Sequence, residues 1–315
     1  MWLLLKYTLL YASVLMLVAL GGMFSERSGV INIALEGIMV VGGLIGVVMI
    51  NIMNAAGVPI ALALLITIGA SALAGAIYSS LLAFSAINLK ADQTIGGTAL
   101  NLLAAALAVV VAKRVNGTDS SKISYSSSVN QHLNNVNYTF NIGPLTVNWF
   151  IVVSVAALAI AWFILYKTRF GMRLMSCGEH PQAADSVGIN VYKMRWAGVL
   201  MSGALGGIGG MAYIIPSVSS WNFEVGVSGA GFLALAVMIF GQWKPFRIFL
   251  AAVFFALFKS LANIASSIPF LADLGWTQNM YNMIPFIASM IILAFTSKKS
   301  RAPKAEGIPY DKGSR

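Results

Sequence analysis

The chain has 315 residues, of which 58% are hydrophobic and 10% are charged, and its mean hydropathy is +0.82. Soluble domains carry about 25% charged residues, so this composition excludes an ordinary soluble domain and predicts an all-α polytopic membrane protein. The net charge of +10 does not predict a nucleic-acid partner, because most Lys and Arg residues lie in short loops beside apolar runs or in the C-terminal tail.

Apolar runs of membrane-spanning length follow one another along the chain and are separated by short polar turns. We predict about nine transmembrane helices, within a range of roughly eight to ten. The higher number would fit if residues 29–50 contained a broken helix. The predicted spans are residues 7–24, 30–50, 58–88, 94–112, 149–166, 196–215, 229–241, 248–268 and 282–295.

Basic residues concentrate in residues 167–195, in residues 244–247 and in residues 298–315, and basic loops stay on the cytoplasmic side of a membrane. Alternation of the spans then places the Ser- and Asn-rich segment 113–146 outside, as an extended loop or a small cap. We therefore predict one transmembrane domain over residues 1–297 and a basic cytoplasmic tail over residues 298–315. The tail has no core-forming pattern, so it is predicted to be disordered or to lie on the surface.

The longest charged segment, residues 169–195, lies between two apolar runs and must therefore contact water at a membrane face. Pro181 suits the first turn of a helix, and Gly188 suits its end. The sequence predicts a short helix over residues 181–187 that lies on the cytoplasmic surface.

Three motifs are distinctive: GMRLMSCGEHPQAADSVGINV at residues 171–191, FSERSGVINIALEG at residues 24–37, and APKAEGIPYDKG at residues 302–313. The first resembles the cytoplasmic coupling loop of permease subunits of ABC importers. These permeases form the family that serves branched-chain amino acids, ribose-type sugars and nucleosides. The other two motifs resemble its nucleoside branch, which works with a basic membrane lipoprotein. The resemblance runs over nearly the whole chain and favours a nucleoside permease.

The resemblance implies a multi-pass permease of a bacterial plasma (inner) membrane that works by alternating access and is not itself an enzyme. It implies three protein partners: an ABC ATPase subunit, a second permease subunit that is usually a different chain, and an extracytoplasmic substrate-binding lipoprotein. The predicted helix 181–187 would dock in a groove of the ATPase, with Ala183 and Ala184 forming one small face. The residues expected at this coupling contact are Gly178, Glu179, Pro181, Ala183, Ala184, Asp185 and Gly188.

The sequence also allows other functions. Branched-chain amino acids and sugars are the alternative substrates within the family. An ATP-independent secondary transporter would predict more charges inside the membrane for ion coupling. A membrane enzyme would need a catalytic constellation, and the sequence holds no HExxH, GxSxG or GxxxxGK[ST] motif. The single cysteine, Cys177, excludes an intrachain disulfide and a Cys-based metal site, and no cofactor is expected.

Two pairs of residues are candidates for the substrate path. Glu36 lies well within an apolar run, with Asn32 four residues earlier on the same predicted helix face. The alternative for Glu36 is an ion pair with Arg27 or with another loop charge near the inner surface. Trp221 and Phe223 lie in a polar interruption on the outer side, where they would either stack on a nucleobase or anchor the chain at the membrane interface.

Lys259 interrupts an apolar run about 12 residues after Arg247, which corresponds to a depth of roughly 18 Å. It either faces a polar cavity, pairs with Asp273, or lies near the surface in a shallower insertion. The glycines of SGALGGIGG, residues 202–210, have GxxxG spacing, which predicts close helix packing.

Overall fold

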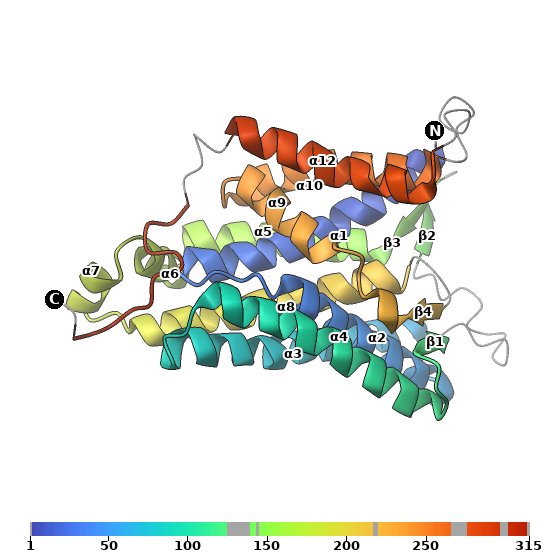
Figure 1. Ribbon diagram of the computed structural model, residues 1–315, viewed down its shortest axis with the longest axis horizontal. Coiled ribbons are helices and arrows are strands. Elements are labelled where there is room, and N and C mark those ends of the chain that lie inside the picture. Colours follow the sequence, from blue (N-terminus) through green and yellow to red (C-terminus); the bar gives the residue numbers. More distant parts are fainter. Residues whose placement is uncertain are drawn as a thin grey trace.

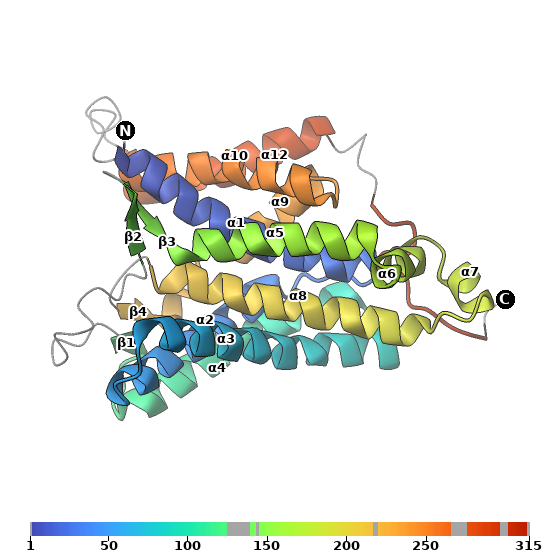
Figure 2. The ribbon, with the colours of Figure 1, turned by 180° about the vertical axis from the view of Figure 1, so that it is seen from behind.

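The computed structural model describes residues 2–124, 139–142, 145–216, 220–265, 276–296 and 302–313. Its helices lie alongside one another in a single bundle (Figures 1 and 2). The core forms where α8 (Val191–Ile214) packs against α1 (Trp2–Arg27), α2 (Leu35–Ala55) and α3 (Ile60–Ala83). Every residue of α1 from Leu10 to Glu26 is buried, so this helix is surrounded by protein.

Within the described residues, seven helices are long and apolar enough to cross a membrane. Two further apolar helices are shorter: α9 (Ala230–Phe240), and residues Met280–Ile291 of α12 (Gln278–Thr296). The predicted number of about nine is therefore not confirmed as a count of full-length spans. The seven long helices are α1, α2, α3 with its π-helical extension η1 (Phe84–Asn88), α4 (Gln93–Asn116), α5 (Trp149–Lys167), α8 and α10 (Pro245–Ile264).

Polar residues at the helix starts explain several of the observed boundaries. Asp92 accepts hydrogen bonds from the backbone amides of Thr94 and Ile95 at 2.8 and 3.0 Å, which fixes the start of α4. Asn148 caps α5 and Asn190 caps α8 in the same manner. These caps supply partners for backbone amides that have none within the helix.

The predicted span 30–50 begins with a non-helical segment. α1 ends at Arg27 and α2 begins only at Leu35, so residues 28–34 form a break. Side chains of α4 supply hydrogen-bond partners for the backbone of this break. Gln93 accepts from the amide of Ile31 at 2.8 Å, and Asn101 donates to the carbonyl of Ile33 at 3.0 Å. Such partners are what irregular backbone inside a membrane protein requires.

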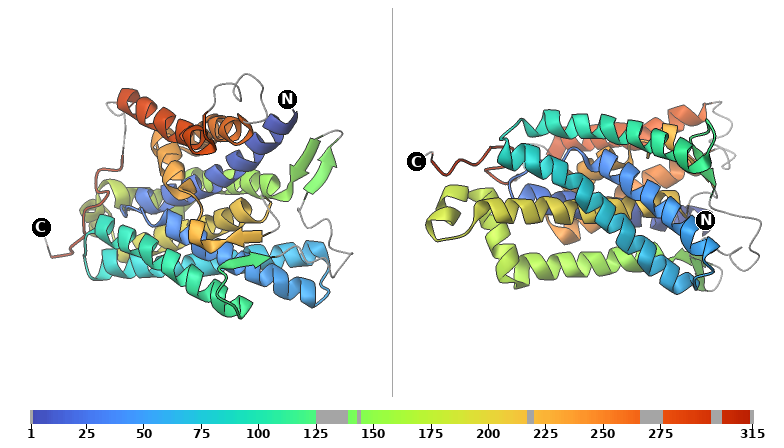
Figure 3. Two further views of the ribbon diagram at one scale, coloured as in Figure 1. Left: turned by 45° about the vertical axis from the view of Figure 1, so that its right-hand side comes forward. Right: turned by 90° about the horizontal axis from the view of Figure 1, so that it is seen from below.

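The two ends of the bundle carry different structures (Figures 1 and 3). One end holds the short strands β1 (Lys122–Ser124) and β4 (Ser220–Asn222), which pair antiparallel, and the hairpin β2 (Thr139–Ile142) and β3 (Leu145–Asn148). The segment 113–146 is thus tied to β4 through β1, and residues 125–138 of it lie outside the described part.

The opposite end holds α6 (Arg169–Glu179), α7 (Pro181–Ser186) and the C-terminus (Figure 2). Residues 302–313, hereafter the C-terminal strap, pack here against the rest of the chain. Ala305 and Tyr310 of the strap are only 6% and 5% exposed. The described part of the predicted surface tail is therefore folded onto the bundle.

Candidate functional site

The segment predicted as a charged loop is largely helical. Thr168 caps α6 by accepting from the amide of Gly171 at 3.2 Å, and α7 follows after a single non-helical residue, His180. The predicted helix 181–187 is present and ends one residue early, at Ser186. α8 begins at Val191, so Arg195 belongs to it and is only 1% exposed.

α7 has one face against its own chain and one exposed face. Pro181 and Ala184 are buried, whereas Ala183 and Val187 are exposed, Val187 at 75%. This corrects the expectation that Ala183 and Ala184 form one small face. Neighbouring residues of a helix point in different directions, so only Ala183 of the two is open to a partner.

Other residues expected at the coupling contact serve contacts within the chain. A Cβ on buried Gly178 would lie 2.3 Å from the carbonyl oxygen of Arg27, so α6 and the end of α1 touch through backbone. Glu179 pairs with Arg27 across 3.9 Å. Asp185 is half-buried, and Gly188 is exposed in a left-handed conformation with φ +83°. The structure thus brings these residues to one end of the bundle, but only some of them are open to a partner.

Asn32 and Glu36 do not share a helix face, because Asn32 lies in the break before α2. Asn32 is fully buried and donates from Nδ2 to Ser202 Oγ of α8 at 2.8 Å. Glu36 accepts from the backbone amides of Gly229 and Gly231 at 2.8 and 2.6 Å. Its carboxylate therefore lies at the N-terminus of α9, where a negative charge is favourable.

The alternative interpretation of Glu36, an ion pair with Arg27, is wrong. The Arg27 guanidinium pairs with Glu179 and donates from Nε and Nη2 to the carbonyl oxygen of Trp243 at 3.2 and 3.1 Å. Both groups thus have other partners, and Glu36 connects α2 to the start of α9.

The two aromatic candidates, Trp221 and Phe223, have different surroundings. Phe223 is 1% exposed and packs in the core, so it offers no free face for stacking. Trp221 is half-buried, donates from Nε1 to the carbonyl oxygen of Gly226 at 3.0 Å, and packs edge-on against Tyr213 with centroids 5.7 Å apart. Tyr213 in turn lies 6.3 Å from Tyr11, so three rings form a continuous aromatic row.

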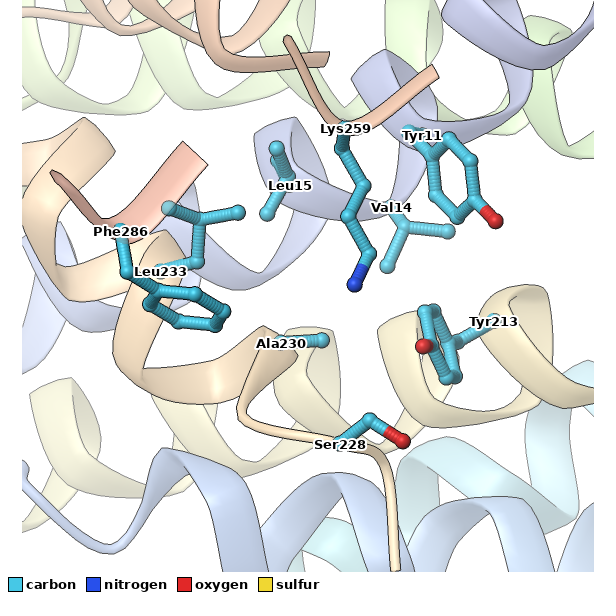
Figure 4. A pocket seen from close by; sticks show the side chains of 9 residues that line it. All are labelled: Tyr11, Val14, Leu15, Tyr213, Ser228, Ala230, Leu233, Lys259 and Phe286. Carbon is cyan, nitrogen blue, oxygen red and sulfur yellow. The ribbon is translucent and has the colours of Figure 1, made fainter. Parts of the chain in front are cut away.

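Lys259 lies in α10 and faces a small cavity between helices (Figure 4). The cavity has a volume of about 10 Å³, which suits roughly one water molecule. The Glu36 carboxylate is an electrostatic neighbour of Lys259. The lining residues are Tyr11, Val14, Leu15, Tyr213, Ser228, Ala230, Leu233, Lys259 and Phe286.

This position of Lys259 agrees with the interpretation that it faces a cavity. The suggested partner Asp273 lies outside the described residues. The sequence signal for the cavity is the lysine itself, since a charge within an apolar span marks a polar site. Its neighbours Tyr11, Tyr213 and Ser228 come from three other segments and carry no such signal.

The glycines of residues 202–210 bring α8 into backbone contact with its neighbours, as their spacing predicted. A Cβ on Gly207 would lie 2.2 Å from the carbonyl oxygen of Ser71 in α3, and one on Gly203 would lie 2.1 Å from Ser79 Oγ. On the α2 side, a Cβ on Gly42 would lie 2.3 Å from the Cα of Gly207. Close packing is therefore their role in this structure.

Comparison with known proteins agrees with this architecture. The family described as branched-chain amino acid transport system / permease component matches residues 4–294. The chain is 40% identical to the guanosine ABC transporter permease protein NupQ of Bacillus subtilis over 98% of this chain and 96% of that protein. It is also 40% identical to the nucleoside ABC transporter permease protein NupC of Lactococcus lactis over 96% and 95% of the two chains.

A more distant relative is the nucleoside ABC transporter permease protein NupB of Lactococcus lactis, which is 26% identical over 56% of this chain and 46% of that protein. No solved structure matches the chain. The family match and the seven long apolar helices together show a multi-pass membrane protein. The resemblance predicted from the three motifs is thereby confirmed, and the chain belongs to the family of permease components of branched-chain amino acid transport systems.

Proposed function

We propose that this chain is a transmembrane permease subunit of an ATP-driven ABC importer for nucleosides. The observation that supports it is the 40% identity, along almost the whole chain, to two permeases whose names specify guanosine and nucleosides. The chain forms the translocation path, and ATP is hydrolysed on a separate ATPase subunit. Its place is the bacterial plasma membrane, with α6 and α7 on the cytoplasmic side.

The exposed face of α7 is the contact for the ATPase. A short helix that projects from the bundle and offers the small side chain of Ala183 can enter a groove, and ATP-driven closure of that groove then moves the helix. A second permease subunit completes the path. The relatives NupC and NupB of one organism are two distinct nucleoside permeases, which supports a pair of different chains. A substrate-binding lipoprotein delivers the nucleoside on the outer side.

The substrate path includes the cavity at Lys259. A nucleoside is uncharged and joins a flat base to a sugar that is rich in hydroxyl groups, so a row of aromatic rings with a few polar side chains suits it. Trp221 and Tyr213 supply rings, and Lys259 supplies an ammonium donor. Glu36 fixes the start of α9 beside this cavity. Asn32 connects the break before α2 to Ser202 of α8, and Phe223 lies in the core.

Uptake measurements test the substrate class. The assembled transporter, with its ATPase, second permease and binding lipoprotein, is reconstituted in vesicles and given ATP and labelled guanosine. We expect ATP-dependent guanosine uptake that other nucleosides compete with and that leucine, ribose and glucose leave unchanged. Uptake of leucine or a sugar in place of guanosine would assign the chain to one of those substrates.

A substitution on α7 tests the coupling contact. Ala183→Trp places a large ring on the exposed face, so we expect the ATPase to co-purify at about one tenth of the wild-type level or less. The matched control is Ile52→Trp, which adds a ring at a 51% exposed position near the other end of the bundle. Normal ATPase recovery with Ala183→Trp would mean that α7 is not the docking helix.

A further inference from the structure

The C-terminal strap is joined to three separate segments by backbone hydrogen bonds. The amide of Ala305 donates to the carbonyl oxygen of Gly178 at 2.8 Å, and the amide of Gly307 donates to that of Gly29 at 3.3 Å. Arg195 of α8 donates from Nη1 to the carbonyl oxygen of Ile308 at 2.9 Å. The strap thus connects the end of α6, the break after α1 and the start of α8.

Glycines make this approach possible. Gly29 has φ +97°, and a Cβ there would lie 2.8 Å from Arg195 Nη2 and 3.3 Å from the carbonyl oxygen of Ala305. Gly307 has φ +76°, and a Cβ there would lie 2.7 Å from Ile31 Cδ1. L-residues with side chains rarely adopt such φ values, so the backbone on both sides of the contact is shaped for a close fit.

Tyr310 carries the strap beneath α7. It is 5% exposed and belongs to a small apolar cluster with Cys177 of α6, Ala184 of α7 and Val191 of α8. Its ring also meets that of Tyr192 edge-on, with centroids 5.4 Å apart. One side chain of the strap therefore touches all three helices that surround the coupling contact.

Polar contacts fix the strap at Tyr310 and at the residue that follows it. Burial and a hydrogen bond to the Asp185 carboxylate of α7 raise the pKa of the Tyr310 phenol, so the hydroxyl stays protonated and donates. The next residue, Asp311, pairs with Lys90 before α4 at 3.1 Å. The strap thus ties α7 to a further segment on the same end of the bundle.

α7 has six residues, and a helix of that length has too few internal hydrogen bonds to hold itself in place. Its orientation must come from what its inner face contacts, and that face rests on Tyr310 through Ala184. We propose that Tyr310 is a positioning residue for coupling: the strap holds α7 so that movement of the ATPase is passed to the transmembrane helices. This inference rests on the proposed docking of the ATPase at α7.

Graded substitutions of Tyr310 test the inference in the reconstituted transporter. We expect Tyr310→Ala to lower uptake per ATP hydrolysed about tenfold, because α7 loses its support, while basal ATP hydrolysis persists. Tyr310→Phe, which keeps the ring and loses the bond to Asp185, should retain most of the coupling. The matched control Ile308→Ala changes an apolar strap side chain that is 57% exposed and should behave as wild type.

A second measurement reports docking of the strap directly. Cys177 is the only cysteine and is fully buried in the Tyr310 cluster, so Tyr310→Ala should speed its alkylation while Ile308→Ala should not. Where Tyr310→Ala gives too little protein, Tyr310→Leu retains an apolar side chain and allows the same comparison. Unchanged uptake per ATP in Tyr310→Ala would overturn the inference, whether the alkylation of Cys177 became faster or stayed the same.

The two proposals fail in different ways. If wild type imports guanosine and Tyr310→Ala does so with full coupling, the inference about the strap is wrong and the proposed function stands. If wild type imports no nucleoside, the proposed function is wrong. In that case the strap is judged by the alkylation of Cys177, and equal rates in Tyr310→Ala and wild type would refute the inference.

Discussion

A lysine side chain inside an apolar bundle costs free energy, about 2.5–3.5 kcal/mol at the centre of a membrane helix. α10 nevertheless carries Lys259, and its ammonium group points toward Ala230 and Ser228 at the start of α9 (Figure 4). Glu36 is its electrostatic neighbour and accepts from two amides of that same start. The charge is thus arranged around the end of a helix, which is a common way to build a binding site for a polar solute within a membrane.

Replacing this charge should affect both stability and transport. We expect Lys259→Met to lower the melting temperature of the purified protein, because the Glu36 carboxylate loses its neighbouring positive charge, and to lower guanosine uptake per folded transporter about tenfold. The control is Lys6→Met, which removes an exposed lysine of α1 and should leave both quantities unchanged. Full uptake by Lys259→Met would show that the cavity is not part of the substrate path.

At the scale of elements, the bundle depends on helices whose backbones touch. α8 meets α2 and α3 through glycines at which a side chain has no space. Hydrophobic attraction between helices is weak in lipid, so close van der Waals packing holds them together. The small residues of α8 are therefore a condition for assembly of the core.

A substitution at one of these close contacts should break it. Gly207→Val would place atoms 2.2 Å from the carbonyl oxygen of Ser71, and overpacking of this kind costs about 1–3 kcal/mol or more. We expect a large loss of folded protein after detergent extraction, read by gel filtration and thermal melting. Gly69→Ala in α3 is the matched control, because a Cβ there has no neighbour within 4 Å. Equal yields of the two variants would show that the α3–α8 contact is more adaptable than its geometry implies.

Sequence alone predicts the elements that depend on local composition. The span 149–166 differs from α5 (Trp149–Lys167) by a single residue, because hydropathy and the Asn148 cap lie within the segment itself. The break at residues 28–34 was only allowed for, since its backbone is satisfied by Gln93 and Asn101 from a distant helix. The docking of the C-terminal strap was not predicted either, because it also depends on contacts with segments that are distant in the sequence.

The candidate coupling contact shows a different limit of prediction from the sequence. Helical geometry alone separates Ala183 from Ala184, so their shared face could have been rejected from the sequence. Ala184 is the buried one of the two because it belongs to a cluster with Cys177, Val191 and Tyr310, and Tyr310 lies more than a hundred residues later. The structure brings this segment to one end of the bundle, but which of its side chains remain open was not predictable from the sequence.

At the scale of the whole molecule, the two ends of the bundle differ in the kind of surface they offer. The end with α6 and α7 carries much of the basic charge, including Arg169, Arg173 and Lys193, and the strap adds Lys304 and Lys312. The end with β1 and β4 carries polar contacts such as that of Ser121 Oγ with Asn222 and Glu224 at 2.7 and 2.8 Å. The positive-inside rule therefore predicts that α7 lies in the cytoplasm and the strand pair outside.

Cysteine labelling of intact cells tests this orientation, but the native thiol is unsuitable. Cys177 is fully buried, and burial raises the pKa of its thiol, so little thiolate is present for alkylation on either side of the membrane. In a Cys177→Ser background, Val187→Cys and Val225→Cys place single thiols at opposite ends, at positions that are 75% and 59% exposed. With the chain produced without its ATPase, an impermeant maleimide should label Val225→Cys in intact cells and Val187→Cys only after permeabilisation. The reverse pattern would show the opposite topology, in which α7 does not lie on the side of the membrane where ATP is hydrolysed.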